Sequence, residues 1–173
     1  APVGRAMKFA RRGLLALPAI LGACSPSGML NAAAPEEGFS VATDLAYGPH
    51  ARHRLDVYRP DDAVDAPTVL FLYGGAWQRG RRQTYRFLGA SLASAGVVCV
   101  VADYRVWPEV GFPAFLHDSA RATAWTKAHI AEHGGDPKRL FAMGHSAGAY
   151  NVAMLALDPS YLGEVGMEAK RDL

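Results

Sequence analysis

The chain has 173 residues, half of them hydrophobic and a fifth charged, which is typical of one soluble globular domain with its own core. Four of its 18 basic residues precede Cys24 and none of its 16 acidic residues does, so the formal net charge of +2 hides a slightly acidic remainder. This balance argues against nucleic-acid binding, and the two cysteines, Cys24 and Cys99, are too few for a disulfide framework.

The first 24 residues have the organisation of an export signal. A basic stretch ending at Arg12 precedes the apolar run 14–21 and the small residues 22–24, as in a secretory signal peptide, and the run is too short to span a membrane. Leu21-Gly22-Ala23-Cys24 also resembles a bacterial lipobox, in which Cys24 is acylated and becomes the mature N-terminus; the alternative is an ordinary signal with an incidental cysteine. We expect an exported protein, periplasmic or at the cell surface, anchored to a bacterial membrane through Cys24.

Residues 25–38 are rich in Ala, Pro, Ser and Gly without periodicity, which predicts a flexible tether before a domain at 39–173. Hydrophobic patterns predict strands at 41–47, 53–58, 68–73, 97–102 and 139–143, and helices at 85–95, 114–133 and 149–157. Cys99 falls in one of the buried strands, as a core residue. Because strands alternate with helices, we predict the α/β class with a doubly wound, mostly parallel sheet.

The segment Gly144-His145-Ser146-Ala147-Gly148 has the form Gly-x-Ser-x-Gly between a predicted strand and a predicted helix. This context favours a nucleophile elbow, in which the two glycines leave room for a strained turn and Ser146 projects with a helix N-terminus behind it. The alternative is a loop that merely contains serine and glycine. His145 is held too tightly within the motif to act as a base, so we expect it to line the pocket or pack under the turn.

A second informative segment, Tyr73-Gly74-Gly75-Ala76-Trp77, directly follows a predicted central strand. A Gly-Gly loop in this place can turn backbone N–H groups toward the top of the sheet. Together with the N–H of Ala147, those of Gly75 and Ala76 could bind the oxyanion of a tetrahedral intermediate. We therefore take Gly75, Ala76 and Ala147 as candidate oxyanion-hole residues.

The remaining histidines and acids are weaker candidates. His129 and His133 are four residues apart on one predicted helix face and could bind a metal, but no third ligand is evident. We favour a solvated helix end and predict neither a metal nor an organic cofactor. Asp118, near the start of the same helix, could pair with Arg105 in a structural role.

Taken together, these motifs resemble those of an α/β-hydrolase of the carboxylesterase type, close to bacterial esterases with a His-Gly-Gly-x-Trp loop and to arylformamidases. The segments that carry the resemblance are 55–58, 73–77, 103–105, 112–114, 135–137 and 144–148. Tyr73 stands where many relatives have histidine, and we expect this to tune the pocket rather than abolish activity. The resemblance implies that Ser146 attacks an acyl carbonyl while a histidine, activated by an aspartate, removes its proton.

In this fold the triad follows the order serine, acid, histidine, yet the residues after Ser146 include Asp158 and Asp172 but no histidine. We therefore expect the chain to be the N-terminal part of the fold, without the triad acid and base. The strand 139–143 would then be an open, apolar sheet edge, and the chain alone would be inactive and prone to aggregation.

Three functions remain open on the sequence alone. The first is a serine hydrolase that cleaves carboxylic esters of small acyl or aryl substrates, and the second is an arylformamidase or amidase with the same machinery. The third is a truncated, non-catalytic remnant that kept the elbow but lost its base. The expected partner of the first two is a small-molecule ester or amide.

Overall fold

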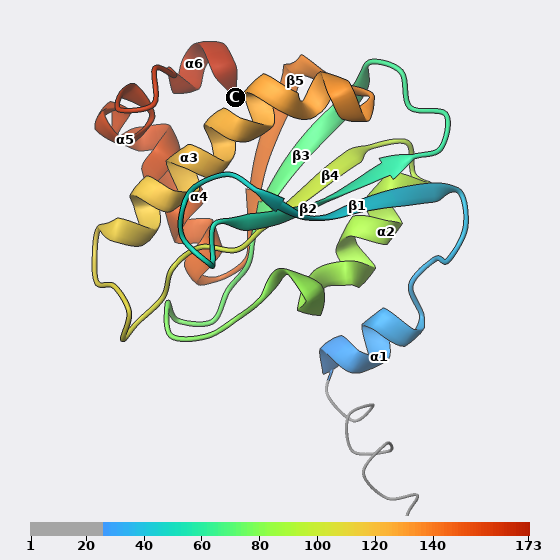
Figure 1. Ribbon diagram of the computed structural model, residues 1–173, viewed down its shortest axis with the longest axis horizontal. Coiled ribbons are helices and arrows are strands. Elements are labelled where there is room, and N and C mark those ends of the chain that lie inside the picture. The colour runs from blue at the N-terminus through green and yellow to red at the C-terminus, as the bar shows by residue number, and fades with distance from the viewer. Residues whose placement is uncertain (1–25) are drawn as a thin grey trace, which may run out of the picture.

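The computed structural model describes residues 26–173, so the expected signal peptide and Cys24 lie outside the described part of the chain. Its strands form one five-stranded sheet in the order β1-β2-β4-β3-β5 (Figure 1). The described residues contain no helix with the length and apolar character that crossing a membrane requires.

The sheet is mixed. The strands β1 (Phe39–Ala46) and β2 (Arg54–Pro60) are antiparallel, and β2 is also antiparallel to β4 (Val98–Ala102). The central strand β3 (Ala66–Leu72) is parallel to both β4 and β5 (Gly135–Gly144). The predicted α/β fold class is confirmed. Parallel pairing is confined to β3, β4 and β5, which helices connect. A short turn joins β1 to β2, and two strands joined by such a turn pair antiparallel.

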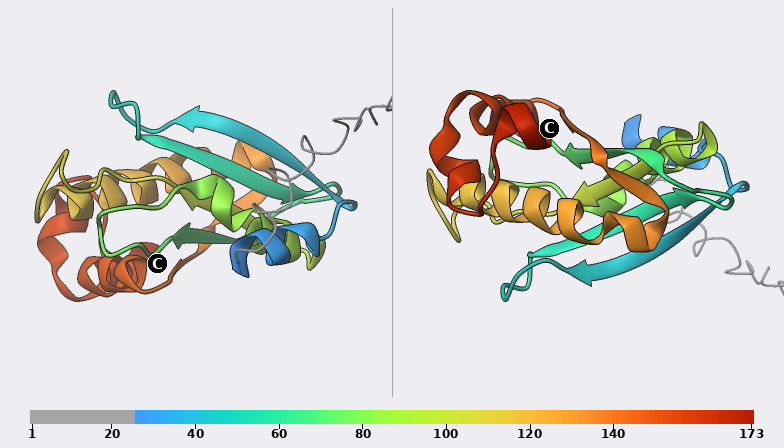
Figure 2. Two further views of the ribbon diagram at one scale, coloured as in Figure 1. Left: turned by 90° about the horizontal axis from the view of Figure 1, so that it is seen from below. Right: turned by 90° about the horizontal axis from the view of Figure 1, so that it is seen from above.

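Three long helices cover the sheet. Helix α2 (Arg86–Ser94) packs against β2 and β4, whereas α3 (Ala114–His129) and α4 (Ala147–Leu157) pack against each other and against β3 and β5. In Figure 2 the β1–β2 pair lies on the far side of the molecule from α4. The helix predicted at 114–133 is α3 continued by the 3-10 turn η3 (Ile130–His133). The smaller elements are η2 (Arg82–Tyr85), α5 (Pro159–Gly163) and α6 (Ala169–Asp172).

The core lies between the central strands and the helices. All five residues of β4 are buried, and Leu70 and Leu72 of β3 are completely enclosed. Cys99 belongs to this core as predicted, and burial raises the pKa of its thiol to about 12. The thiol therefore stays protonated at neutral pH and is no candidate nucleophile.

A short helix, α1 (Pro26–Ala32), lies within the segment where composition predicted a flexible tether. The side chain of Asn31 attaches it to the domain, because its Nδ2 donates to Thr84 O at 3.1 Å and its Oδ1 accepts from Phe87 N at 2.8 Å. The second bond satisfies an N–H in the first turn of α2, which has no partner within that helix. Composition alone could not reveal this helix, since the contacts that hold it are more than 50 residues away in the sequence.

The strand β5 is the last strand of the sheet and, among the described residues, pairs only with β3. Its outer part carries exposed apolar side chains, with Phe141 53% and Met143 39% accessible. The open, apolar edge predicted for the strand 139–143 is therefore present, and such edges favour association between chains.

Candidate active site

The turn between β5 and α4 holds Ser146 in a backbone conformation that non-glycine residues rarely adopt. Its φ is +53° and its ψ is −117°, a combination that costs free energy and persists only where the surrounding structure enforces it. The N–H of His145 donates to Leu72 O at 3.1 Å, and Ser146 O accepts from Tyr150 N at 3.1 Å. These bonds attach the turn to the end of β3 and to the first turn of α4, and Ser146 is left exposed.

The two glycines of the motif are required by close packing. A Cβ added to Gly144 would lie 2.4 Å from the carbonyl of Gly148, and one added to Gly148 would lie 2.0 Å from Leu72 O. Both distances are far below van der Waals contact, so neither position can hold a larger residue without moving β3, β5 or α4. The strained turn that the sequence predicted is present.

The glycine-rich loop after β3 lies directly beside this turn. A Cβ on Gly74 would be 2.9 Å from the Cβ of Ser146, so the two segments are in contact. Gly75, Ala76 and Trp77 follow with φ values of +138°, +54° and +54°. Positive φ values at the non-glycine residues Ala76 and Trp77 are strained, and such strain persists where the surrounding structure enforces it, commonly at functional sites.

The three N–H groups predicted to form an oxyanion hole are unoccupied donors. Within residues 26–173, the N–H groups of Gly75, Ala76 and Ala147 make no hydrogen bond. Ala147 is the first residue of α4, so its N–H is one of those that a helix leaves unsatisfied at its positive end. Donors of this kind can bind a negatively charged oxygen.

A side-chain contact that sequence reasoning missed holds the loop against α4. The indole Nε1 of Trp77 donates to Asn151 Oδ1 at 2.9 Å, and Asn151 Nδ2 donates to Ser119 Oγ at 3.1 Å. Asn151 is completely buried, so this amide is satisfied by these partners rather than by solvent. The sequence feature that could have indicated this contact is Asn151 itself, a polar residue within a mainly apolar helix five residues after Ser146.

Below the loop, Tyr73 belongs to a buried polar network. Its hydroxyl donates to Asp103 Oδ1 at 2.7 Å and accepts from Arg52 Nη2 at 3.0 Å, while Tyr104 OH donates to Tyr73 O at 2.6 Å. Burial, together with the charge and hydrogen bond of Asp103, raises the pKa of Tyr73 well above its usual range. Tyr73 thus supports the start of the loop as a neutral phenol.

Arg82 extends this network and was also missed from the sequence. Its guanidinium donates to Asp56 Oδ1 at 2.8 Å, to Asp103 Oδ2 at 2.5 Å and to Asp44 Oδ1 at 2.7 Å. Burial disfavours the charged form, but the hydrogen bonds with Asp56 and Asp103 outweigh it and raise the pKa of Arg82 above its usual value. The arginine therefore remains charged, with its buried charge compensated by carboxylates.

A second ion pair involves Asp118. Arg105 donates to both oxygens of this carboxylate, with Nε–Oδ2 at 2.8 Å and Nη2–Oδ1 at 2.7 Å, so the predicted structural pair is present. Although burial opposes it, these bonds hold the pKa of Asp118 below its ordinary value. His53 Nε2 lies 3.0 Å from Asp118 Oδ1, and burial lowers the pKa of this histidine.

No histidine within residues 26–173 is hydrogen-bonded to Ser146. His145 lines the cavity beside Ser146, which is one of the two roles predicted for it. Its Nδ1 lies 3.3 Å from Tyr85 OH. His129 contacts Glu132 at 3.2 Å on an exposed helix end. No group of three or more potential metal ligands occurs in the described part of the chain.

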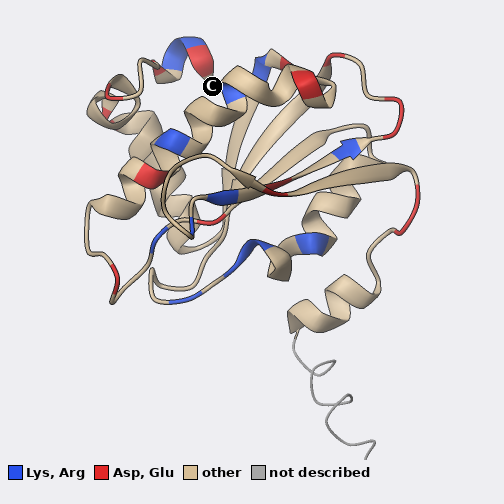
Figure 3. Ribbon diagram, in the orientation of Figure 1, with Lys and Arg blue, Asp and Glu red and all other residues tan. Residues whose placement is uncertain are grey.

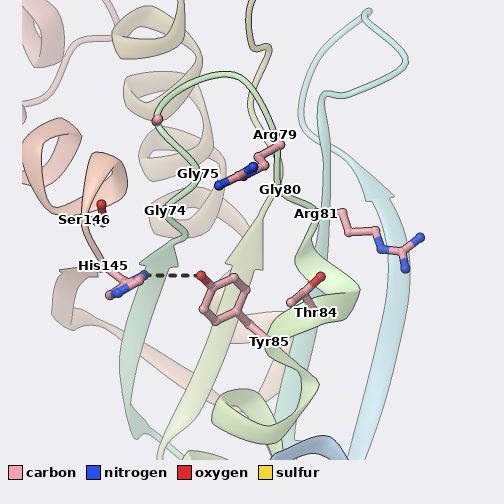
Figure 4. Close-up of a pocket in the computed structure, with 10 residues that line it drawn as sticks. Gly74, Gly75, Arg79, Gly80, Arg81, Thr84, Tyr85, His145 and Ser146 are labelled. Atoms are coloured by element: carbon pink, nitrogen blue, oxygen red, sulfur yellow. Dashed lines mark hydrogen bonds between the residues drawn. The ribbon is translucent and has the colours of Figure 1, made fainter. Parts of the chain in front are cut away.

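Two cavities meet at Ala76. The first, of about 610 Å³, contains Ser146, His145, Gly75 and Tyr85 (Figure 4). The second, of about 450 Å³, is mainly apolar, and its aromatic lining residues are Trp77, Trp107, Phe112, Phe115 and Tyr150. An aromatic pocket formed by Trp77 and residues of the loop 105–112 thus lies next to the glycine-rich loop.

The mixed sheet, the helices on its faces and the strained serine turn define an α/β-hydrolase fold. The family model described as BD-FAE matches residues 55–165, which is more than half of the chain. The chain therefore belongs to the BD-FAE family.

Comparison with known proteins agrees with this assignment. The chain is 34% identical over 163 residues to LipM of Mycobacterium tuberculosis, named as a probable carboxylic ester hydrolase, with 91% of this chain and 38% of that protein covered. It is 36% identical over 114 residues to a probable isoprenylcysteine α-carbonyl methylesterase of Arabidopsis thaliana, covering 65% of this chain and 24% of that one.

Among solved structures, the hyperthermophilic esterase of Pyrobaculum calidifontis matches with a TM-score of 0.66 and 31% identity, over 79% of this chain and 45% of that one. The predicted resemblance to carboxylesterases of the α/β-hydrolase superfamily is confirmed. The chain spans less than half the length of each of these three relatives.

Proposed function

We propose that the protein containing this chain hydrolyses carboxylic esters through an acyl-enzyme on Ser146. The observation that carries the proposal is the strained, exposed Ser146 at the wall of a cavity, with unoccupied N–H donors beside it. In this mechanism Ser146 Oγ attacks the ester carbonyl and the carbonyl oxygen becomes an oxyanion. The oxyanion accepts hydrogen bonds from the N–H groups of Gly75, Ala76 and Ala147, the alcohol leaves, and water then hydrolyses the acyl-enzyme.

The backbone donors supply much of the rate enhancement in this proposal. Loss of one oxyanion donor typically slows an enzyme by about 10²- to 10³-fold. The donors here are fixed before substrate binds, because the loop is bonded to α4 through Trp77 and the N–H of Ala147 belongs to a helix N-terminus. Such preorganised donors need no rearrangement when the charge develops.

The reaction also requires a general base and an acid that orients it. Residues 26–173 provide no imidazole hydrogen-bonded to Ser146, so in this proposal both groups come from residues outside that range. The order serine, acid, histidine in this fold supports a base that follows Ser146 in the sequence. The reaction is therefore assigned to the longer protein, and the isolated chain is expected to be inactive.

The substrate proposed is a small acyl or aryl ester. The aromatic cavity beside the glycine-rich loop supports an aryl group, because ring faces and edges of Trp77, Phe115 and Tyr150 already pack against one another there. Its volume of about 450 Å³ is within the range of small-molecule sites. The same cavity would hold the ring of an N-formyl aryl amide, which keeps an arylformamidase or amidase as the second candidate.

A parallel assay of an aryl acetate and an N-formyl aryl amide, with the natural full-length protein, separates the two hydrolases. If the aryl acetate is hydrolysed at least tenfold faster than the N-formyl aryl amide, the protein is an esterase. The opposite preference supports the formamidase. If neither is hydrolysed and a fluorophosphonate fails to label Ser146, the serine is not activated. The non-catalytic alternative then holds.

We also propose that the protein is exported and anchored by a lipid on Cys24, which lies outside the described residues. The basic and apolar stretches before the cysteine support this assignment. In a bacterial host, labelled palmitate should be incorporated into the protein and lost in Cys24→Ala, with release of the protein from membranes. Export with no lipid label would support an ordinary signal peptide instead.

A further inference from the structure

The cavity that contains Ser146 is lined by positively charged groups without acidic residues. Arg79 and Arg81 are among its lining residues, and none of these is an aspartate or glutamate. The loop between β3 and α2 carries blue segments and no red one in Figure 3. An unpaired cation next to a reactive serine therefore affects which substrates can bind.

The carboxylates of the buried network below the loop form no ion pair with Arg79 or Arg81. Asp56 and Asp103 are buried and already accept hydrogen bonds from Arg82, which also binds Asp44. Although Arg79, Arg81 and Arg82 lie within four consecutive positions, only Arg82 forms an ion pair with another residue of the described range 26–173. The guanidinium of Arg79 has no hydrogen-bond or ion-pair partner among residues 26–173.

The side chains of Arg79 and Arg81 point in different directions. Figure 4 shows that the side chain of Arg79 extends from the loop over the cavity, on the side of Gly74 and Ser146, whereas that of Arg81 extends away from it. Arg79 is thus the cation that a bound substrate would meet.

The backbone around Arg79 is fixed on both sides. Its N–H donates to Gly75 O at 3.2 Å, and the carbonyl of the next residue, Gly80, accepts from Arg52 Nη2 at 2.8 Å. A Cβ on Gly80 would lie 2.5 Å from the ring of Tyr73, so the loop also packs closely on the network below. A side chain on such a fixed backbone loses less entropy when it binds a ligand.

We propose that Arg79 binds an anionic group, a carboxylate or a phosphate, on the ester that Ser146 cleaves. This inference rests on the proposed function and adds a substrate class to it. A planar guanidinium with free donors binds either oxyanion with two parallel hydrogen bonds. The aromatic cavity on the other side of Ala76 has no charged lining residue, so it suits the neutral part of the same substrate.

The test compares matched esters that differ in one charge, with the natural full-length protein. In one pair the charge is on the leaving group, para-acetoxybenzoate against para-acetoxybenzamide. In the other it is on the acyl group, a monoaryl adipate against the corresponding adipamate. In one of the two pairs, we expect kcat/KM of the anionic ester to exceed that of the neutral ester by about tenfold at low salt. If that pair carries the charge on the leaving group, the leaving group faces Arg79; if it carries the charge on the acyl group, the acyl group does.

Arg79→Gln should abolish this preference while hydrolysis of the neutral ester is retained. The matched control is Arg121→Gln, an exposed arginine of α3 that lines neither cavity, and it should keep the preference. Equal rates for charged and neutral esters in both pairs, or a preference that survives in Arg79→Gln, would overturn the proposal.

If no ester is hydrolysed, the result counts against the proposed ester hydrolysis, and a binding measurement then tests anion binding by Arg79 separately. Calorimetric titration of the wild-type protein with para-hydroxybenzoate and para-hydroxybenzamide compares anion with neutral analogue directly. The anion should bind about tenfold more tightly to the wild type and equally with the amide to Arg79→Gln. Equal binding of the two to the wild type contradicts an anion site at Arg79.

Discussion

Replacing Ser146 with alanine is expected to reduce ester hydrolysis by the natural full-length protein by a factor on the order of 10⁵ in kcat. The substitution removes the hydroxyl that we propose attacks the carbonyl, while the backbone donors of Gly75, Ala76 and Ala147 remain. Those donors and substrate binding leave a small residual rate above that in water. Steady-state hydrolysis of an aryl acetate measures the loss, and fluorophosphonate labelling should disappear with it.

Two further variants show whether the loss is chemical rather than structural. Ser146→Gly should be equally inactive but slightly more stable than Ser146→Ala, because glycine adopts a φ of +53° without the strain that alanine retains. Thermal melting compares the two. Ser40→Ala, on an exposed part of β1, should keep full activity. A Ser146→Ala protein that retains more than a few per cent of the wild-type rate contradicts Ser146 as nucleophile.

The parts of the site that depend on local chain geometry could be predicted from the sequence. Glycine is required at positions 144 and 148 because the turn packs closely against its own helix and the end of β3. The succession of a strand, this turn and a helix is therefore recognisable in the sequence as a motif. The Gly-Gly loop was recognisable for the same reason, because a tight backbone turn demands particular residues at particular positions.

The parts that depend on long-range contacts could not. Asn151 meets Trp77 across 74 positions, and Arg82 meets Asp44, Asp56 and Asp103 across 38, 26 and 21 positions. The sequence shows three arginines near each other, at 79, 81 and 82, with nothing to indicate that one is buried among carboxylates and another faces a cavity. Only the fold separates these roles, since it decides which carboxylate each side chain can reach.

The antiparallel half of the sheet has a similar explanation. Strand positions for β1 and β2 were predicted, but alternating patterns do not state a partner or a direction. The turn at His50–His53, where His53 N donates to His50 O at 2.9 Å, reverses the chain and makes the pair antiparallel. The helical crossovers from β3 onward then make the remaining pairs parallel.

Replacing Arg82 with methionine is expected to lower the free energy of unfolding by about 3–5 kcal/mol, a large part of the roughly 5–15 kcal/mol that stabilises a typical domain. Methionine fills much of the same volume but leaves the carboxylates of Asp56 and Asp103 buried without their cation. An uncompensated buried charge is more costly than the net gain from the intact pair, because the carboxylates cannot recover their hydration in place. Urea denaturation of the wild-type and Arg82→Met proteins, followed by circular dichroism, measures the change in the free energy of unfolding.

Two controls locate this effect in the buried pairs. Arg59→Met removes an arginine of β2 whose Nε bonds only to Ser40 Oγ at an exposed site, and it should change stability by less than about 0.5 kcal/mol. Asp44→Asn should have a similarly small effect, because the Asp44 side chain is 66% exposed and solvent screens its pair with Arg82. If Arg82→Met unfolds at the same urea concentration as these two variants, the prediction is contradicted. The carboxylates of Asp56 and Asp103 are then hydrated in the folded protein, and the network does not support the loop beside Ser146. A large loss confined to Arg82→Met instead means that the end of β3 and the loop that follows it depend on this one buried cation.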